Sequence, residues 1–273
     1  MRARRHIGVL IKHDLRYTLS SARGLLFLVL FGLVWAWVLW KLAGGFGERL
    51  ASPQGGFFLA WLFDSNIAQL FQDRPPTLAA YFVVAAMLTP MFGVLASCDQ
   101  TATDIGTRHI RFLIPRVGRA EIFVARLLGA AIVMSVAQLA AGIAATIVAL
   151  VVHTGGDISS GAIVAYGAEV TALLIVYSLP IVALMSLVSA GMGSIGLALL
   201  VGLGGYALLG VALGLMPFTG KMATIISFIV PSRLKPYLLQ PSIGPALGAC
   251  AGAAAYVALY TFLGWQVFRR RDA

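Results

Sequence analysis

The sequence predicts an all-α membrane protein with six transmembrane helices in a single domain over residues 1–273. Of its residues, 60% are hydrophobic and only 11% are charged, and the mean hydropathy is +0.92. Soluble domains carry about 25% charged residues, so water is not the main solvent for this chain. The apolar residues fall in long runs, and a bilayer core needs about 20 such residues per helix. The length therefore allows several spans but no large soluble domain.

Residues 1–23 predict an amphipathic helix on the cytoplasmic membrane surface. Apolar residues recur there at helical spacing and basic residues take the other faces: Ile7, Leu10, Ile11, Leu15 and Leu19 against Arg4, Arg5, Lys12 and Arg16. A signal peptide is the competing interpretation. It is less favoured because the charged region is long and no small-residue cleavage site follows the apolar stretch.

The predicted spans are residues 25–42, 78–97, 125–152, 162–188, 195–216 and 245–268. With the N-terminus inside, 14 of the 20 Lys and Arg residues lie on the cytoplasmic side. Because positive loops stay inside, both termini are expected in the cytoplasm of a bacterial or archaeal cell, with the chain in its inner membrane. The net charge of +10 is explained by this topology, and we expect no nucleic-acid partner.

Two outer loops are unusual. Residues 44–77 hold many aromatic residues but too many charges to span, which predicts an interfacial helix with an aromatic anchor. Residues 217–244 contain a short apolar piece followed by Pro231, Pro236 and Pro241. A piece of that length cannot cross a bilayer, so we expect a re-entrant or interfacial element.

The sequence shows almost none of the residue arrangements that catalysis requires. The four histidines are scattered, and no nucleophile or metal motif appears. Gly220 and Lys221 resemble the end of a phosphate loop, but Met222 stands where Ser or Thr is needed. We therefore expect no enzyme activity and no cofactor in this chain. Glu169 is the one carboxylate expected inside a span, where a carrier could use it for protons.

The inner loop 98–124 is the most informative segment. It is too polar for the membrane, and Asp99, Thr101 or Thr103 is expected to cap a short helix that Pro115 ends. A second helix is expected to open near residues 119–121 and to continue into the third span. A short helix on the cytoplasmic side is a candidate docking surface, and an ordinary basic topogenic loop is the alternative.

This loop resembles the signature loop of the ABC transporter type-2 permease family. That signature has an acidic residue, Gly-Thr, an apolar stretch ending in Pro, and Arg before a basic residue. The matching residues are Asp99 and Asp104, Gly106 and Thr107, residues 113–115, Arg119 and Arg126. The basic chain end at 268–272 is also similar. The sequence departs from the family at Ile105, where Glu is usual, and at Arg126, where Lys is usual.

The resemblance implies an exporter permease that pairs with a second permease subunit and docks on a separate ATPase, which binds ATP and Mg. The loop helix would be the coupling helix, the N-terminal helix would also touch the ATPase, and 217–244 would be an extracellular gate. The implied coupling residues are Asp99, Thr103, Asp104, Gly106, Thr107, Arg108, Arg111 and Arg119.

Other functions stay open from the residues alone. A proton-coupled secondary transporter would use Glu169, although no duplicated half accompanies it. A membrane-embedded lipid enzyme would need clustered Asp, His or Ser near one interface, and none is present. A non-transporting assembly subunit is the remaining alternative.

Overall fold

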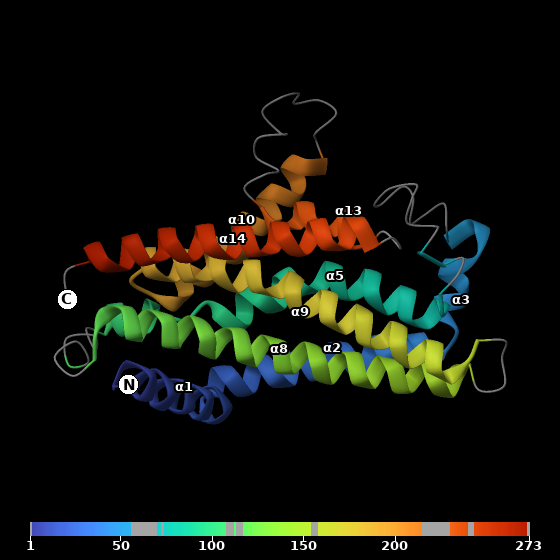
Figure 1. The fold of residues 1–273 in the computed structure, drawn as a ribbon, viewed down its shortest axis with the longest axis horizontal. Helices are drawn as coiled ribbons and strands as arrows, with labels where there is room; N and C mark the ends of the chain where they lie inside the picture. Colours follow the sequence, from blue (N-terminus) through green and yellow to red (C-terminus); the bar gives the residue numbers. More distant parts are fainter. Residues whose placement is uncertain are drawn as a thin grey trace.

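The computed structural model describes residues 2–55, 70–71, 74–107, 112, 117–153, 158–214, 230–239 and 243–271. Within these residues, five helices are long and apolar enough to cross a membrane: α2 (Ala22–Ala43), α5 (Pro76–Ser97), α8 (Arg119–Val152), α9 (Ser160–Gly191) and α14 (Ile243–Arg270). They lie side by side (Figure 1). The chain is therefore an all-α, multi-pass membrane protein, and each of these five helices coincides with a predicted span, although α8 begins at Arg119 rather than at 125.

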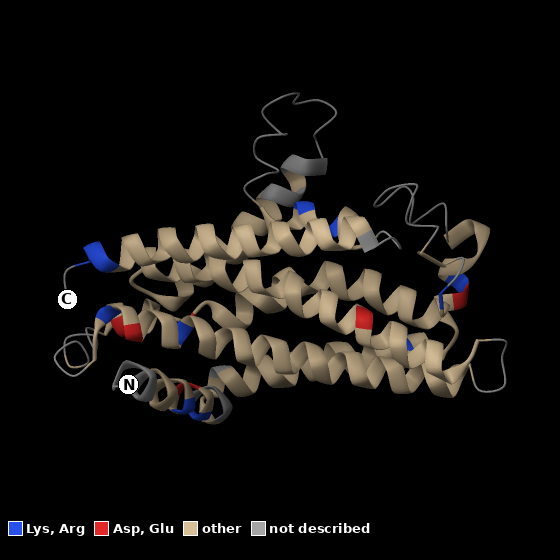
Figure 2. Cartoon of the chain, in the orientation of Figure 1, with Lys and Arg blue, Asp and Glu red and all other residues tan. Residues whose placement is uncertain are grey.

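The helices α5 and α9 form the centre of the bundle, with α2 and α8 on one side and α14 on the other (Figure 1). They are the most buried of the five helices, and each tolerates an internal proline, Pro90 and Pro180. Most charged residues lie toward the two ends of the bundle, and a few, on the segment before α14 and on α9, lie between them (Figure 2). This distribution is the one that a bilayer imposes, because a charge at its centre is costly.

Aromatic residues on one face of α2 pack against α5. Phe27, Phe31 and Trp35 are buried at intervals of four residues. The ring centroids of Phe31 and Phe92 lie 4.9 Å apart, and those of Trp35 and Tyr81 lie 5.0 Å apart. The opposite face of α2 is exposed and apolar, as expected for a helix at the rim of a bundle in lipid.

Small residues bring α8 and α9 into close contact. A side chain on Gly142 would clash with Thr171, and one on Gly167 would clash with Thr146. Ala141, Ala145 and Ala149 of the same α8 stripe are buried. Close backbone approach of this kind stabilises helix pairs in lipid, where hydrophobicity supplies no driving force between helices.

The N-terminal helix α1 (Arg2–Ser20) lies beside α8, as a surface helix before the first span. It ends at Ser20, and the Ser21 side chain accepts a hydrogen bond from the Gly24 amide to start α2. Ile7, Leu10 and Leu15 are half-buried, whereas Lys12 and Arg16 are exposed. The expected amphipathic helix is thus present.

Two ends of the bundle can be defined from contacts. At the end of the bundle that carries the inner loop, called the loop end, the end of α14 contacts the end of α9 and the start of α8. Arg271 donates to the Gly191 carbonyl, and Arg119 donates to the Arg271 carbonyl. At the opposite end, His153 after α8 lies 3.1 Å from Thr77 of α5. Because α9 and α14 both finish at the loop end, the chain between them must return across the bundle.

The helix that follows α9 is α10 (Ile195–Gly214), at the place of the expected fifth span. Its apolar part Ile195–Leu208 is shorter than the other five candidates. The last residues of the expected span, 215–216, lie outside the described part. Of the expected gate element, the described residues form a 3-10 turn, η2 (Pro231–Leu234), and the short helix α13 (Lys235–Leu238), both packed on α14.

The expected interfacial helix in 44–77 is described in part. A short helix, α3 (Phe46–Ala51), follows a left-handed turn at Gly45, where φ is 79°. Most of the aromatic anchor, residues 56–69, lies outside the described residues. The segment 108–111 and Pro115 of the inner loop lie outside them as well.

Candidate functional site

The inner loop leaves α5 at Cys98 and forms the short helix α6 (Ala102–Gly106). Thr101 occupies the N-cap position, but its side chain makes no capping bond. Instead, the Ser189 hydroxyl of α9 accepts from the backbone amides of Thr101 and Ala102 at 2.8 and 3.0 Å. The expected local cap is therefore wrong: the orphan amides of α6 are satisfied from another helix.

Further buried polar bonds hold the loop on α9. Gln100 donates through Nε2 to the Val182 carbonyl oxygen at 3.0 Å. Gln100, Thr101 and Ser189 are all buried. Asp99 accepts from the Thr103 hydroxyl, and the Thr107 hydroxyl donates to the Thr103 carbonyl at 2.7 Å. Buried hydrogen bonds are costly to break without replacement, so the bonds from Gln100, Thr101 and Ala102 fix this loop on α9.

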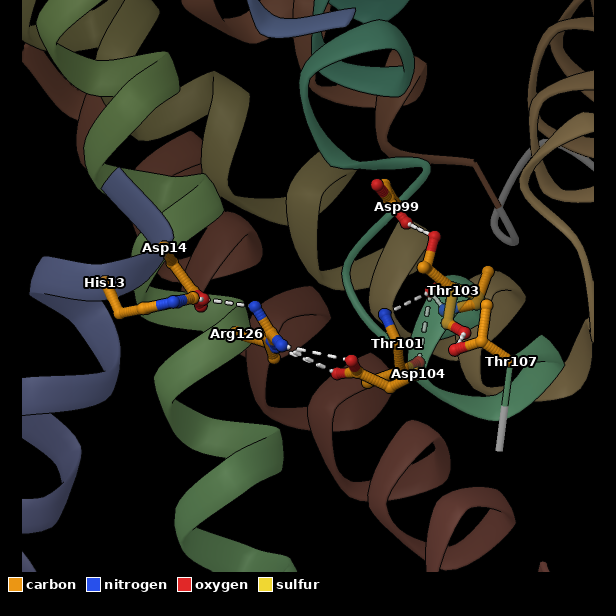
Figure 3. Close-up of polar contacts among 10 residues, drawn as sticks. His13, Asp14, Asp99, Thr101, Thr103, Asp104, Thr107 and Arg126 are labelled. Carbon is orange, nitrogen blue, oxygen red and sulfur yellow. Dashed lines mark hydrogen bonds and ion pairs between the residues drawn. The ribbon is translucent and has the colours of Figure 1, made fainter. Parts of the chain in front are cut away.

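A three-residue ion cluster joins three elements at the loop end (Figure 3). Arg126 of α8 binds Asp104 of α6 in a bidentate manner, with Nε–Oδ2 and Nη2–Oδ1 distances of 3.0 and 3.1 Å. Its Nη1 also donates to Asp14 of α1. Bidentate charge-assisted bonds fix orientation as well as distance. The surface helix, the loop helix and α8 are therefore tied through one guanidinium group.

The charges of the cluster do not balance, because two carboxylates share one guanidinium group. Burial raises the pKa of Asp14 above its ordinary value of 3.8, and Arg126 opposes that shift. Asp104, His13 and Asp99 also act on this carboxyl group, the two acids raising its pKa and His13 lowering it. His13 Nδ1 lies 4.0 Å from Asp14 Oδ1 on an exposed side chain. Burial therefore raises the free-energy cost of keeping the Asp14 carboxyl group ionised.

Asp14 packs beside Gly129 of α8. The nearest atoms to an added Cβ on Gly129 would be those of Asp14, at 3.4 Å and more, which is ordinary van der Waals contact. A cavity of about 320 Å³ adjoins the cluster, with Phe27, Gln100 and Thr103 among its lining residues.

The end of α6 touches the junction between α9 and α10. A Cβ on Gly106 would clash with the Gly193 carbonyl oxygen. Gly106 thus permits a backbone-to-backbone contact that no other residue allows at this position. Through this contact the loop helix abuts the start of α10, and through Ser189 it is fixed to the end of α9.

Arg119 opens α8 and holds the end of α14. Its Nη1 donates to the carbonyl oxygens of Arg269 and Arg271 at 2.9 and 3.1 Å. The expected helix start near 119–121 is confirmed, since α8 begins at Arg119. Arg119 therefore ties two spans at the loop end rather than extending toward water alone.

The predicted coupling residues fall into three groups. Asp99, Thr103, Asp104, Gly106 and Thr107 lie together on the loop and α6. Arg119 lies apart from them, at the α8–α14 contact. Arg108 and Arg111 lie outside the described residues. The site contributions of Asp14 and Ser189 were not expected from the sequence, although Asp14 is the one acid in a strongly basic helix.

Glu169 is not a lone carboxylate. Its Oε2 lies 3.4 Å from Arg74 Nη1, and the two side chains are 48% and 31% exposed. The Arg74 guanidinium also lies 4.7 Å from the Tyr166 ring centroid. Pairing lowers the cost of a carboxylate at this depth, so a structural ion pair explains its presence.

Known proteins add no family to this picture. A scan against protein-family models and a search of the curated proteins return no match. The fold and the loop-end contacts are thus the basis for any functional assignment.

Proposed function

We propose that this chain is the transmembrane permease subunit of an ATP-binding-cassette exporter. In this role it couples ATP hydrolysis by a separate cytoplasmic ATPase subunit to movement of its spans. The chain carries no nucleotide motif of its own, so ATP and Mg belong to the partner. In this proposal the loop end of the bundle faces the cytoplasm, and the chain lies in the inner membrane.

The observation that carries this proposal is the way the loop helix is mounted. Its inner face is bonded to α9 by Ser189, to α8 by Arg126 and to α1 by Asp14 through that arginine. Gly106 at its end and Thr107 just after it are exposed, and Phe112, further along the inner loop, is 73% exposed. A rigidly mounted helix, followed in the same loop by an exposed aromatic residue, suits a lever that a partner protein pushes.

A sixth span is part of the proposal, and α10 is the helix that supplies it. Its 20 residues correspond to about 30 Å of helix, the thickness of a bilayer core. The chain must return across the bundle between α9 and α14, which supports this assignment. Residues 217–244, which include η2 and α13, then follow on the outer side as a gate element.

A second permease subunit, most simply another copy of this chain, completes the transporter. Substrate would pass between the two subunits, lined by α5 and α10. The spans are almost entirely apolar, which favours a hydrophobic or amphipathic substrate. The ion pair with Arg74 offers a structural explanation for the acid that suggested the carrier alternative.

Photo-crosslinking from the inner loop tests the docking surface. Benzoylphenylalanine at Phe112 should capture a soluble ATPase subunit in native membranes, because this side chain of the loop is exposed. The same group at Val136, an exposed position in the middle of α8, is the control and should capture none. Capture of the same protein from both positions, or of no ATPase from position 112, would contradict the docking role.

A further inference from the structure

A cavity at the opposite end of the bundle carries features of a lipid site. It has a volume of about 480 Å³ and lies between the end of α2, α3 and α5. Its lining includes Trp37, Trp40 and Phe46 with Val84, together with Lys41 and Arg49. The proposed transport role assigns no function to these residues.

The aromatic residues of this cavity face outward. Trp37 and Trp40 are 60% and 69% exposed. They end a continuous apolar stripe on the outer face of α2, spaced by three and four residues: Leu26, Val29, Leu33, Trp37 and Trp40. An acyl chain can lie along such an apolar stripe. Tryptophan residues at its end are typical of the membrane level at which the glycerol and headgroups lie.

The charges of the cavity are both positive. Lys41 and Arg49 are exposed, and Lys41 Nζ lies 5.0 Å from the Trp40 ring centroid. Glu48 sits in the first turn of α3 and is not among the lining residues. Two cations beside a cavity at headgroup depth are complementary to the phosphate of an anionic phospholipid.

A second copy of the chain is a poorer occupant of this cavity. A twofold contact presents the same patch from both sides, so it would bring two patches of the same positive sign together. A lipid phosphate carries a negative charge, so its binding does not bring positive groups together. The bilayer also supplies it at this depth.

We propose that this cavity binds one anionic phospholipid, with its phosphate between Lys41 and Arg49 and an acyl chain along the exposed stripe of α2. The site is independent of the ATPase coupling, since it lies at the other end of the bundle. It requires only that the chain spans a membrane.

Native mass spectrometry and thermal unfolding of the full purified chain test the proposal. Dioleoyl phosphatidylglycerol should bind and raise the unfolding midpoint more than dioleoyl phosphatidylcholine. The double variant Lys41→Gln/Arg49→Gln should weaken binding about 30-fold, since each cation near an anionic lipid is worth about fivefold. The variant Arg269→Gln/Arg270→Gln removes two exposed cations from the loop end and should keep the effect.

Three results would overturn the lipid site. The first is an equal response to phosphatidylglycerol in wild type and the Lys41→Gln/Arg49→Gln variant. The second is the same stabilisation by inorganic phosphate or glycerol phosphate alone, which would indicate an anion site without a lipid. The third is conversion of a lipid-free dimer to a monomer by Trp37→Ala/Trp40→Ala, which would make this face a contact between copies.

Discussion

Asp14 is the residue on which the charge balance of the loop end depends. It is buried on an otherwise basic surface helix and shares Arg126 with Asp104. The arginine makes three charge-assisted bonds there, and removing one carboxylate leaves the bidentate pair with Asp104 in place. Asp14 can therefore be neutralised without orphaning the guanidinium, which makes it the best point at which to probe the cluster.

We expect the stability contribution of Asp14 to depend on pH. Since its folded pKa is raised above 3.8 by burial, its contribution is fully present below that value and is lost as pH rises through the folded pKa. Asn mimics the protonated form. Wild type should therefore lose stability relative to Asp14→Asn as the pH rises above about 4, as thermal unfolding midpoints in detergent would show.

The exposed acid Glu48, at the other end of the bundle, gives the matched control. The variant Glu48→Gln should follow wild type across the same pH range. A difference between wild type and Asp14→Asn that stays constant with pH, or that turns in favour of wild type at high pH, would refute the role given to burial.

At the scale of elements, the loop helix α6 depends on its contact with the α9–α10 junction. Because the Gly193 carbonyl is backbone, a side chain at 106 cannot be accommodated by a rotamer change. Gly106→Ala should destabilise the chain by about 1–3 kcal/mol, the usual cost of overpacking. The thermal midpoint should fall, and hydrogen exchange in residues 98–107 should become faster.

Gly193→Ala is the control for this contact, since nothing lies within 4 Å of a Cβ placed there. It should leave both the midpoint and the exchange of the loop nearly unchanged. If Gly106→Ala were as stable as Gly193→Ala, with equal protection of the loop, the close contact between α6 and the junction would not exist in solution.

The elements also show what the sequence could predict. The long apolar helices were predictable because hydropathy and bilayer thickness alone determine them. The start of α8 at Arg119 was likewise expected from local signals. The cap of α6 was not, because Ser189 lies 88 residues from Thr101 and nothing local indicates a bond between them. The Asp14–Arg126 pair, at a separation of 112 residues, escaped for the same reason.

Glu169 shows that a sequence can also suggest a functional residue that the fold explains in another way. Its position in an apolar run suggested a functional acid, since an isolated carboxylate is costly in lipid. Its partner Arg74 precedes α5 and is 95 residues away, so the pair becomes visible only in three dimensions. A charge that looks isolated in a sequence can thus be an ordinary ion pair in the fold.

At the scale of the whole molecule, the topology of α10 distinguishes six crossings from five. Single cysteines at Ser194 and Arg233, in a chain whose Cys98 and Cys250 are replaced by Ala, report which side each residue faces. We expect an impermeant maleimide to label Arg233→Cys in intact cells but Ser194→Cys only after permeabilisation, because α10 lies between them. Labelling of both positions in intact cells would mean that this segment does not cross.

Coupling to a separate ATPase is the central claim for the whole molecule, and co-purification tests it most directly. The tagged chain would be isolated from its native host in mild detergent, and ATPase activity would be measured in the eluate. We predict an ATPase that accompanies wild type and Val136→Ala but is depleted with Phe112→Ala, which removes an exposed ring of the inner loop. A chain that elutes without ATPase activity, under conditions that preserve other membrane complexes, would contradict the exporter function.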